Sequence, residues 1–554
     1  MARNEPLWWQ RGIIYQIYPR SFQDGNADGI GDLAGVIGRL DYLAETLEID
    51  AIWLSPIYPS PMADFGYDVS NYCDIDPIFG DLATFEELVK QTHRRDLRII
   101  VDFVPNHTSD QHPWFLESRS SRHNPKRDWY VWADAKPDGD SEGVLPNNWL
   151  SMFGGPAWEW DQRTGQYYLH SFLKEQPDLN WRNPAVKEAM LDVLRFWLDR
   201  GVDGFRIDVA HLIMKDPELR DNPPNPHVPP DRSVREYDKW LHQYDKAHAD
   251  IHATFREIRS VLDAYNAERP RMAVGEIHEF DWPIWAGYYG ESLDELHMPF
   301  NFALIFSPWT ATAVRQIVES VEAAVPAGAW PNYVLGNHDV HRIATRVGAE
   351  QARVAMMLLL TLRGTPTIYY GDEIGMHDVE IPPERIQDPF EKNVPGVGVG
   401  RDPERTPMQW DAGPNAGFCP AGVEPWLPVA DDYQQVNVAS ELRDPRSLLS
   451  LTRTLIRVRR SNPALIHGDY HSTNDRSPHC FVYLRQLDRN ESGHRCLVAL
   501  NFTDTEQTVA VGNLDIGSVA LSTHLDRDGP VDLTALRLRP NEGCIVDLPL
   551  ERES

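Results

Sequence analysis

Several acidic, basic and histidine side chains stand where apolar runs of the sequence end. "DFVPNH" carries Asp102 and His107, "GFRID" carries Arg206 and Asp208, "VGEI" carries Glu276, and "GNHD" carries His338 and Asp339. These are the groups with which proteins hold and transfer protons. Each has an ordinary explanation by itself, since an Asp after a strand is often a helix cap. Their joint occurrence at the ends of successive runs favours a shared site.

A set of three carboxylates suits cleavage of a glycosidic bond with retention of configuration. One carboxylate attacks the anomeric carbon, and a second carboxyl group protonates the leaving oxygen. The transition state is cationic at the sugar ring, so fixed negative charge nearby stabilises it. Arg206 lies two residues before Asp208 and so on the same strand face, where a charge-assisted hydrogen bond keeps that aspartate ionised and oriented.

The elements that must position these side chains are predicted by eight apolar runs in the first two-thirds of the chain. The runs are rich in β-branched and aromatic residues and are bounded by turn residues, as is typical of buried parallel strands. In order they are "GIIYQIYP", "AIWLSPIY", "LRIIVDFVP", "VDGFRIDVA", "RMAVGEI", "HMPFNFAL", "NYVLGNHD" and "TPTIYYGDEIG". Helical segments lie between several of them; one begins at Asn183 and Pro184 and ends at Gly201.

Eight strands with interleaved helices predict an α/β protein built on a (β/α)8 TIM barrel, with its active site at the carboxyl ends of the strands. Residues 108–177, rich in Trp, Gly, Pro and Asp, predict a small domain inserted after the third strand. Alternation at period two from residue 474 predicts a C-terminal antiparallel β-sandwich. The predicted domains are therefore the barrel (1–107 and 178–473), the inserted domain B (108–177) and domain C (474–554).

The segment "FQDGNADGIGD" offers oxygen donors at alternating positions, namely Asp24, Asn26, Asp28 and Asp32. Its glycines let the backbone fold back, as a site for a hard cation such as Ca²⁺ or Mg²⁺ requires. The segment opens like an EF-hand loop, but Gly35 stands where that loop needs Glu, so an EF-hand is excluded. From these residues alone, a polar glycine-rich turn remains the alternative.

The composition limits the partners of this 554-residue chain. A formal net charge of −30 argues against nucleic acid and against an anionic membrane surface. No apolar run reaches the length of a membrane span, and the first residues show no secretory pattern. Five scattered cysteines without a CxxC pattern predict reduced thiols and a cytoplasmic protein. Monomer and homodimer both remain open.

The motifs resemble, in order, those of glycoside hydrolase family 13, the α-amylase superfamily, and within it the bacterial α-glucosidases and oligo-1,6-glucosidases. The resemblance runs through nearly the whole chain. It begins at "WWQRGIIYQIYPRSFQDGNADGIGDLAG" and continues through "DFGYDVSNY", "DFVPNHTSDQHPWF", "GFRIDVA", "VGEI", "NHDVHR", "YYGDEIGM" and "GRDPERTPMQW". It implies that Asp208 is the nucleophile, Glu276 the general acid/base and Asp339 the stabiliser of the transition state.

The resemblance also implies how substrate and metal are held. His107, Arg206 and His338 would hold the sugar and orient the carboxylates, and Tyr67 would stack on the first bound ring. Asp64 and Arg401 would close the pocket at the non-reducing end. Phe153 and Phe172 would form apolar walls. A structural Ca²⁺ (or Mg²⁺) would be bound by the side chains of Asp24, Asn26, Asp28 and Asp32 and the backbone carbonyl of Ile30.

The implied function is an exo-acting, retaining α-glucosidase that releases α-glucose from the non-reducing end of short α-glucosides, of maltose or isomaltose type, with transglucosylation as a further expectation. Val209 resembles the 1,6-acting enzymes, whereas "DVAH", "NHDVHR" and "YYGDEIGM" depart from their pattern, so the linkage stays open. A sucrose- or trehalose-active hydrolase or isomerase is the alternative. A non-catalytic sugar-binding or transporter-subunit homologue is more remote, because the three carboxylates are retained.

Overall fold

The computed structural model describes residues 7–136, 144–228, 235–267, 269–396, 398–473, 476–487, 494–512 and 514–549. The two ends of the chain and the predicted domain boundary at residue 474 lie outside these residues.

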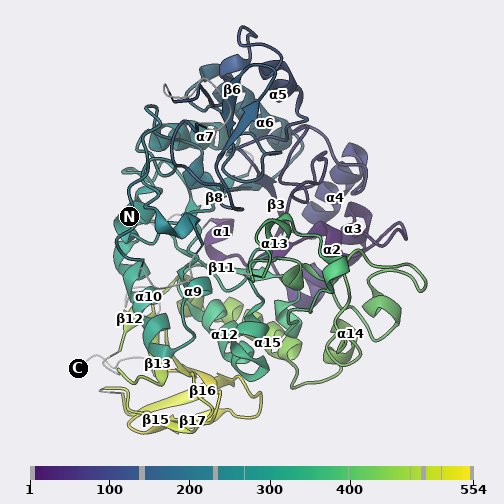
Figure 1. Cartoon of the computed structure of the whole chain (residues 1–554). Helices are drawn as coiled ribbons and strands as arrows, with labels where there is room; N and C mark the ends of the chain where they lie inside the picture. The colour runs from purple at the N-terminus through teal and green to yellow at the C-terminus, as the bar shows by residue number, and fades with distance from the viewer. Residues whose placement is uncertain are drawn as a thin grey trace.

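An eight-stranded parallel sheet forms the centre of the molecule, with strand order β10-β11-β1-β2-β3-β7-β8-β9 (Figure 1). The strands are β1 (Ile14–Ile17), β2 (Ala51–Leu54), β3 (Arg98–Phe103), β7 (Gly204–Ile207), β8 (Met272–Gly275), β9 (Met298–Pro299), β10 (Asn332–Val334) and β11 (Thr365–Tyr369). Each of the eight predicted runs contains one of them, and the sheet curls into a nearly closed barrel. The predicted (β/α)8 fold is confirmed.

The sixth strand is much shorter than the sequence predicts. The run "HMPFNFAL" extends to Leu304, whereas β9 ends at Pro299 and Ala303–Phe306 forms the short helix α9. Pro299 has no backbone N–H to continue the ladder. A short apolar run does not distinguish a buried strand from a buried helix, so periodicity alone could not place this end.

Helices follow the strands and cover the outside of the barrel (Figure 1). In chain order the α-helices of the described residues are α1 (Trp8–Arg11), α2 (Pro19–Phe22), α3 (Leu33–Asp41), α4 (Leu82–Arg94), α5 (Pro113–Ser118), α6 (Pro184–Asp199), α7 (Ile251–Ala264), α8 (Trp282–Gly287), α9 (Ala303–Phe306), α10 (Ala311–Ala324), α11 (Ile343–Val347), α12 (Ala349–Thr361), α13 (Pro389–Asn393), α14 (Val438–Glu441), α15 (Leu448–Ser461) and α16 (Pro463–His467).

Helix α6 shows why the sequence forms these elements. The Asn183 side chain accepts a hydrogen bond from the Ala185 amide at 2.9 Å, and Pro184 occupies the first helical position. Met190, at helical spacing from its apolar neighbours, is buried against the barrel. Gly201 follows the helix with φ +91°, a conformation that a residue with a side chain rarely adopts. The predicted start and end of this helix are confirmed.

The segment between β3 and β7 carries its own small sheet, of order β4-β6-β5, at the top of Figure 1. The strands are β4 (Trp132–Ala133), β5 (Trp158–Asp161) and β6 (Gln166–Leu169), and they pair antiparallel. Trp149, Trp158 and Tyr167 are buried together beside this sheet. An isolated antiparallel bridge joins His107 to Asp178, where the segment leaves and rejoins the barrel.

The C-terminal part, yellow at the bottom of Figure 1, is antiparallel. A six-stranded sheet of order β12-β13-β14-β19-β16-β17 faces a two-stranded sheet of β15 and β18. The strands are β12 (Asp469–Ser472), β13 (Cys480–Gln486), β14 (Arg495–Asn501), β15 (Gln507–Val509), β16 (Ile516–Ser522), β17 (Gly529–Asp532), β18 (Leu536–Leu538) and β19 (Gly543–Asp547). β12 already belongs to this sheet, whereas the sequence predicts domain C from residue 474.

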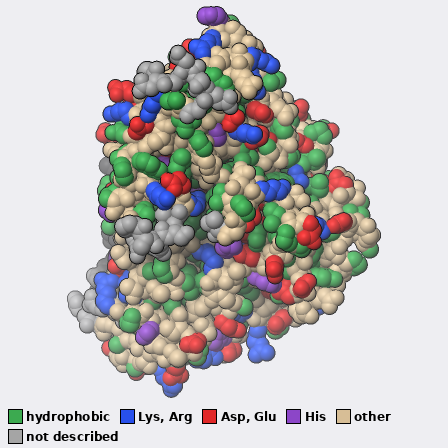
Figure 2. All heavy atoms as spheres, in the orientation of Figure 1, with side chains coloured by type: hydrophobic (Ala, Val, Ile, Leu, Met, Phe, Trp, Pro, Cys, Tyr) green, Lys and Arg blue, Asp and Glu red, His purple; other side chains and the backbone are tan. Residues whose placement is uncertain are grey.

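Charged side chains are spread over the face of the molecule in Figure 2. On the face in Figure 2, acidic and basic side chains are interspersed, with a hollow near the centre of the view. None of the helices in the described ranges combines the length and the apolar character needed to cross a bilayer.

Candidate active site

A cavity of about 270 Å³ lies at the carboxyl ends of the barrel strands, beside the inserted segment. Most of the predicted catalytic and substrate residues line it: Asp64, Tyr67, His107, Phe153, Phe172, Asp208, Glu276, Asp339 and Arg401. Arg206 and His338 lie directly behind this wall and are each 1% exposed. The structure therefore brings all of these residues together around one space.

One guanidinium connects the two carboxylates that the sequence assigns to bond cleavage. Nη1 of Arg206 donates to Oδ1 of Asp208 at 2.7 Å, and Nη2 donates to Oε2 of Glu276 at 2.5 Å. Nη1 also reaches Oδ1 of Asp102 at 3.2 Å. The planar, forked shape of the guanidinium lets one side chain fix two carboxylates in a set geometry. The two carboxyl groups thus face the same part of the cavity, as double displacement requires.

The backbone after β7 is strained in a way that serves this arrangement. Val209 adopts φ +34°, which is rare for a β-branched residue. In this conformation the Val209 amide donates to Oε2 of Glu276 at 2.9 Å. The Asp208 amide donates to the Phe103 carbonyl of the neighbouring strand at 2.8 Å. Strain of this kind persists where the surrounding structure imposes it, and here it aims both carboxylates into the cavity.

Asp208 and Glu276 share a buried, negatively charged neighbourhood, so they titrate as a pair. Burial and the charges of Glu276 and Asp102 raise the pKa of Asp208 well above its ordinary value, against the effect of Arg206. Burial also acts to raise the pKa of Glu276, but Arg206 and a hydrogen bond from His278 outweigh it and bring that pKa below its usual range. His278 Nε2 lies 2.8 Å from Oε1 of Glu276. Arg206, which contacts both carboxylates, favours the ionised form of each and acts against the effect of burial.

Asp339, the third carboxylate, is held ionised. Burial acts against its charge, but His338, Arg405 and Arg401 together lower its pKa to about 2. Oδ1 of Asp339 accepts from Arg405 at 2.8 Å and from Arg401 at 3.3 Å. The backbone of this turn is fixed as well, because Nε of Arg405 donates to the His338 carbonyl at 2.7 Å.

A hydrogen-bonded chain runs behind the cavity from β1 to β3. Burial lowers the pKa of His338 to about 3, so its imidazole is neutral. Nδ1 accepts from the Gln16 amide at 2.8 Å, which leaves the proton on Nε2, 2.6 Å from the Tyr67 hydroxyl. Tyr67 donates in turn to Oδ2 of Asp102 at 2.9 Å. The Tyr67 ring stacks on His338 at 5.4 Å, so the chain fixes its orientation beside the cavity.

One side of the pocket is closed by an ion-pair cluster. Nη2 of Arg401 contacts Oδ1 of Asp64 at 2.7 Å and Oδ1 of Asp388 at 2.6 Å. Oδ2 of Asp64 accepts from the Gln176 amide at 3.1 Å, and the Arg401 guanidinium lies 4.9 Å from the centre of the Phe153 ring. The predicted pair of Asp64 and Arg401 is therefore part of a four-residue clamp with an aromatic wall.

His107 lines the same cavity and contacts the clamp through Gln176. Burial lowers its pKa to about 4, so it is neutral at neutral pH. Its Nε2 lies 3.1 Å from the Gln176 amide nitrogen, and its ring meets the edge of Phe172 at 5.2 Å. The same amide group therefore orients both His107 and Asp64.

Sequence reasoning missed several residues that support the site. Arg405 and His278 had a signal, because Arg405 lies in the motif "GRDPERTPMQW" and His278 follows Glu276 by two residues. Gln16 lies inside the first strand, where a buried amide in an apolar run is itself unusual. Asp388 stands at the start of α13, where Asp followed by Pro indicates only a helix cap, and Gln176 stands in a loop, so only their contacts connect them with the site.

The predicted metal loop lies away from the cavity, between α2 and α3. Its donor set is all oxygen, which suits Ca²⁺ or Mg²⁺, and Asp24 and Asp32 are buried. The Asp24 carboxylate accepts from the Ala27 and Gly29 amides at 2.6 and 2.9 Å, and the Asp32 side chain caps α3 by accepting from Gly35 at 2.7 Å.

The side chains of Asn26 and Asp28 also accept hydrogen bonds from backbone amides of the loop. Asn26 accepts from the Asp28 amide at 3.0 Å, and Asp28 accepts from the Ile30 amide at 2.8 Å. Burial raises the pKa of Asp32, and the charges of Asp24 and Asp28 add to this effect. The residues present therefore fit a hard cation by donor type, and a cation would offset the negative charge of the loop's three carboxylates.

Comparisons with known proteins agree with this geometry. The model of the α-amylase catalytic domain matches residues 16–468. The chain is 45% identical over 477 residues to a probable alpha-glucosidase of Rhizobium meliloti, covering 83% of this chain and 84% of that protein. It is 37% identical to an oligo-1,6-glucosidase of Parageobacillus thermoglucosidasius, covering 99% and 100%.

A solved structure of an alpha-glucosyl transfer enzyme, XgtA, superposes with a TM-score of 0.90 at 38% identity, covering 98% of this chain and all of that one. The matches extend through the barrel and the C-terminal sheets, and the carboxylates and the guanidinium that the motifs contain surround one cavity. This chain belongs to the α-amylase family, glycoside hydrolase family 13, and is a glycoside hydrolase.

Proposed function

We propose that this enzyme is an exo-acting α-glucosidase that releases α-glucose with retention of configuration from the non-reducing end of short α-glucosides. The observation that carries the proposal is the pair of Asp208 and Glu276 on one guanidinium, facing Asp339 in a closed-ended pocket. The names of similar proteins, alpha-glucosidase and oligo-1,6-glucosidase, support the same substrate class.

Two displacements account for the reaction. In the first, a carboxylate oxygen of Asp208 bonds to the anomeric carbon while the glycosidic C–O bond breaks and Glu276 gives its proton to the leaving oxygen. In the second, Glu276 takes a proton from water, whose oxygen attacks the same carbon and displaces Asp208. Asp339, ionised with a pKa of about 2, stabilises the positive charge that develops on the ring.

The first step requires the proton of the carboxylate pair to be on Glu276. Arg206 and His278, which lies 2.8 Å from the Glu276 carboxylate, favour the ionised form of Glu276 and so set the pH range in which it can hold the proton. A glycosidic oxygen beside Glu276 offers the protonated acid an acceptor, and a sugar over Asp208 places a developing cation beside the ionised carboxylate. In this proposal a bound glucoside therefore favours a protonated Glu276 beside an ionised Asp208.

The closed end of the pocket supports exo action. Arg401 forms ion pairs with Asp64 and Asp388 at the wall of the cavity. In this proposal they occupy the space that a longer chain would need beyond the first ring. A terminal glucose can meet this wall with its hydroxyl groups, whereas an internal unit of a long glucan cannot pass it. Transfer of the glucosyl group to a sugar or an alcohol uses the same intermediate, with the acceptor in place of water.

The configuration of the first product tests this proposal. Proton NMR during hydrolysis of p-nitrophenyl α-glucoside should show α-glucose before mutarotation sets in, and β-glucose as the first product would contradict the mechanism. A panel of maltose, isomaltose, sucrose, trehalose and amylose then fixes the linkage. Rapid cleavage of amylose into long fragments would contradict exo action, and exclusive action on sucrose or trehalose would favour the alternative within the family.

We also propose that the loop from Asp24 to Asp32 binds a structural Ca²⁺ (or Mg²⁺) through Asp24, Asn26, Asp28, Asp32 and the Ile30 carbonyl. Its all-oxygen donors and the presence of three carboxylates in one short loop support this. Addition of Ca²⁺ to the chelator-treated wild type should raise its melting temperature above that of the chelator-treated protein. Asp28→Asn should weaken this response, whereas Asp515→Asn, an exposed control, should keep it. Equal responses of all three proteins would contradict the proposal.

A further inference from the structure

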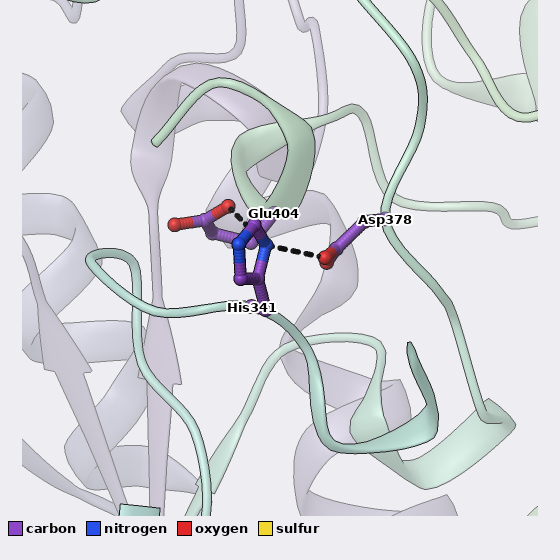
Figure 3. Close-up of side chains that lie close together, drawn as sticks. All are labelled: His341, Asp378 and Glu404. Carbon is purple, nitrogen blue, oxygen red and sulfur yellow. Dashed lines mark hydrogen bonds and ion pairs between the residues drawn. The ribbon is translucent and has the colours of Figure 1, made fainter. Parts of the chain in front are cut away.

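Three side chains from separate segments of the chain, His341, Asp378 and Glu404, lie close together (Figure 3), and none of them lines the cavity. Nδ1 of His341 lies 2.7 Å from Oδ2 of Asp378 and 3.9 Å from Oε2 of Glu404. The three donor atoms all lie within 4.8 Å of one another, and over the described ranges no other set of three His, Cys, Asp or Glu residues does so. The imidazole in Figure 3 stands between the two carboxylates.

Glu404 gives an independent indication of a missing partner. Its side chain is 2% exposed, and its Oε2, the atom that faces His341, has no hydrogen-bond donor. A buried carboxylate oxygen without a donor is costly, since water no longer solvates it. Such an oxygen aimed at an imidazole and a second carboxylate calls for a proton or a cation.

The other two ligands are already oriented. Oδ1 of Asp378 accepts from the Arg342 amide at 2.9 Å, which turns Oδ2 toward the cluster. The Asp378 amide donates to Oγ1 of Thr345 at 2.7 Å and fixes the loop after β11. His341 is about half exposed, so water can complete the coordination of an ion from that side. Oriented ligands with an open position are typical of protein metal sites.

We propose that Nδ1 of His341, Oδ2 of Asp378 and Oε2 of Glu404 bind one divalent transition-metal ion, of the Zn²⁺ or Mn²⁺ class. One imidazole and two carboxylates suit such an ion, whereas Ca²⁺ and Mg²⁺ prefer ligand sets made of oxygen alone. The site is separate from the loop of Asp24 and takes a different class of metal.

The position of the cluster indicates what an ion there would do. His341 follows Asp339 by two residues in the same turn, and Glu404 precedes Arg405, which donates to Asp339 at 2.8 Å. An ion bound to His341 and Glu404 would therefore tie together the two segments that hold Asp339, and Asp378 would add the loop after β11. Its role is positional, because none of its three ligands lines the cavity.

The competing account needs no metal. Burial raises the pKa of Glu404 well above its ordinary value, and the Asp378 carboxylate raises the pKa of His341. A protonated Glu404 beside an imidazolium paired with Asp378 would also neutralise the cluster. This account predicts no specific binding of a divalent ion, so direct measurement separates the two.

The test is isothermal titration calorimetry, in which ZnCl₂ or MnCl₂ is added to the chelator-treated full-length protein. We expect at least one of these metals to bind at one equivalent per chain and CaCl₂ to leave that site vacant. His341→Gln and Glu404→Gln should each weaken the binding at least about tenfold. His377→Gln is the matched control, since His377 is a nearby exposed histidine paired with Asp432 at 3.4 Å.

Three further arms make the result decisive. Circular dichroism and the melting temperature of the metal-free variants show whether they are folded, and Asp378→Asn replaces either variant that is not. Co²⁺ bound at the site should give visible absorption bands that His341→Gln abolishes. Asp28→Asn should leave the Zn²⁺ titration unchanged. Absence of binding by the wild type, or equal binding by His341→Gln and the control, would overturn the proposal.

Discussion

At the scale of single residues, the site depends on one side chain that serves two carboxylates. Arg206 donates to Asp208 through Nη1 and to Glu276 through Nη2, at 2.7 and 2.5 Å. A lysine ammonium at this position could not hold both groups in one plane. The roles that we propose for Asp208 and Glu276 therefore depend on the shared partner Arg206. A substitution of either carboxylate should also change the electrostatic environment of the other.

Asp208→Asn should abolish most of the activity and leave the fold intact. The amide is nearly isosteric and can still accept from Arg206, but it cannot form the covalent bond to the anomeric carbon. We expect turnover of p-nitrophenyl α-glucoside to fall by about three orders of magnitude or more. Asp192→Asn, an exposed change on α6, is the control. Turnover within tenfold of the wild type would remove Asp208 from its role.

His278→Ala should move the alkaline limb of the pH–rate profile. The hydrogen bond from His278 favours ionised Glu276 and lowers its pKa. The general acid must be protonated, so activity is lost as the pH rises through the pKa of the carboxylate pair. Without His278 that loss should occur at higher pH, as a profile of kcat/KM between pH 5 and 10 would show. An alkaline limb that stays in place or moves down contradicts this reasoning.

At the scale of elements, the loops that follow the strands place the chemistry, and the helices behind them fix those loops. α15 shows how such a helix begins in the interior. Oε2 of Glu441 accepts from the Leu449 amide in its first turn at 2.9 Å. Burial raises the pKa of Glu441 to about 8, so this carboxyl group is largely protonated at neutral pH in the folded protein.

Glu441→Gln should make the folded protein less sensitive to rising pH. An unfolded glutamate titrates near pH ~4.3. Between that pH and about 8 the folded state binds a proton that the unfolded state lacks, so the contribution of Glu441 to stability falls as the pH rises. Glutamine cannot ionise and keeps an acceptor for the Leu449 amide.

The measurement is the melting temperature at pH 5 and at pH 9. The melting temperature of Glu441→Gln, taken relative to that of the wild type, should be higher at pH 9 than at pH 5. The exposed control Glu384→Gln should show no such difference. A parallel pH dependence of the wild type and Glu441→Gln would show that Glu441 does not titrate in this window.

At the scale of the whole molecule, the C-terminal sheet packs against the barrel and contributes to its stability. Phe481 and Tyr483 of β13 are buried in the same core as the helices of the barrel. Arg485 of β13 crosses this interface, donating to the Thr361 carbonyl at the end of α12 at 2.6 Å and to the Gly468 carbonyl at 2.7 Å. The sheet is therefore not an independent appendage.

Arg485→Met should destabilise the barrel as well as the sheet. Methionine preserves most of the apolar stem but leaves two buried carbonyl groups without donors, at a cost of about 1–3 kcal/mol each. We expect a lower melting temperature and loss of activity and sheet structure in one transition. Arg537→Met, at an exposed arginine of β18, is the control. Loss of the sheet signal while activity persists would show that the two parts unfold independently.

The sequence by itself determined the barrel and the composition of the site. Parallel strands that are buried on both faces need continuous apolar runs, so eight such runs identified eight strands. Because the carboxyl ends of these strands meet, Asp208, Glu276 and Asp339 had to converge. Local chemistry also fixed α6, through Asn183 and Pro184 at its start.

Only the tertiary structure decided which groups hold these carboxylates and with what charge. Asp388 and Gln176 come from a helix cap and a loop, so no periodicity could place them against Arg401 and Asp64. The pKa values of the acidic pair depend on burial and on contacts between strands, such as that of Arg206 with Glu276, which lies 70 residues further along the chain. The position of β9, and the meeting of His341 with Asp378 and Glu404, likewise follow from packing between segments, which the order of residues does not encode locally.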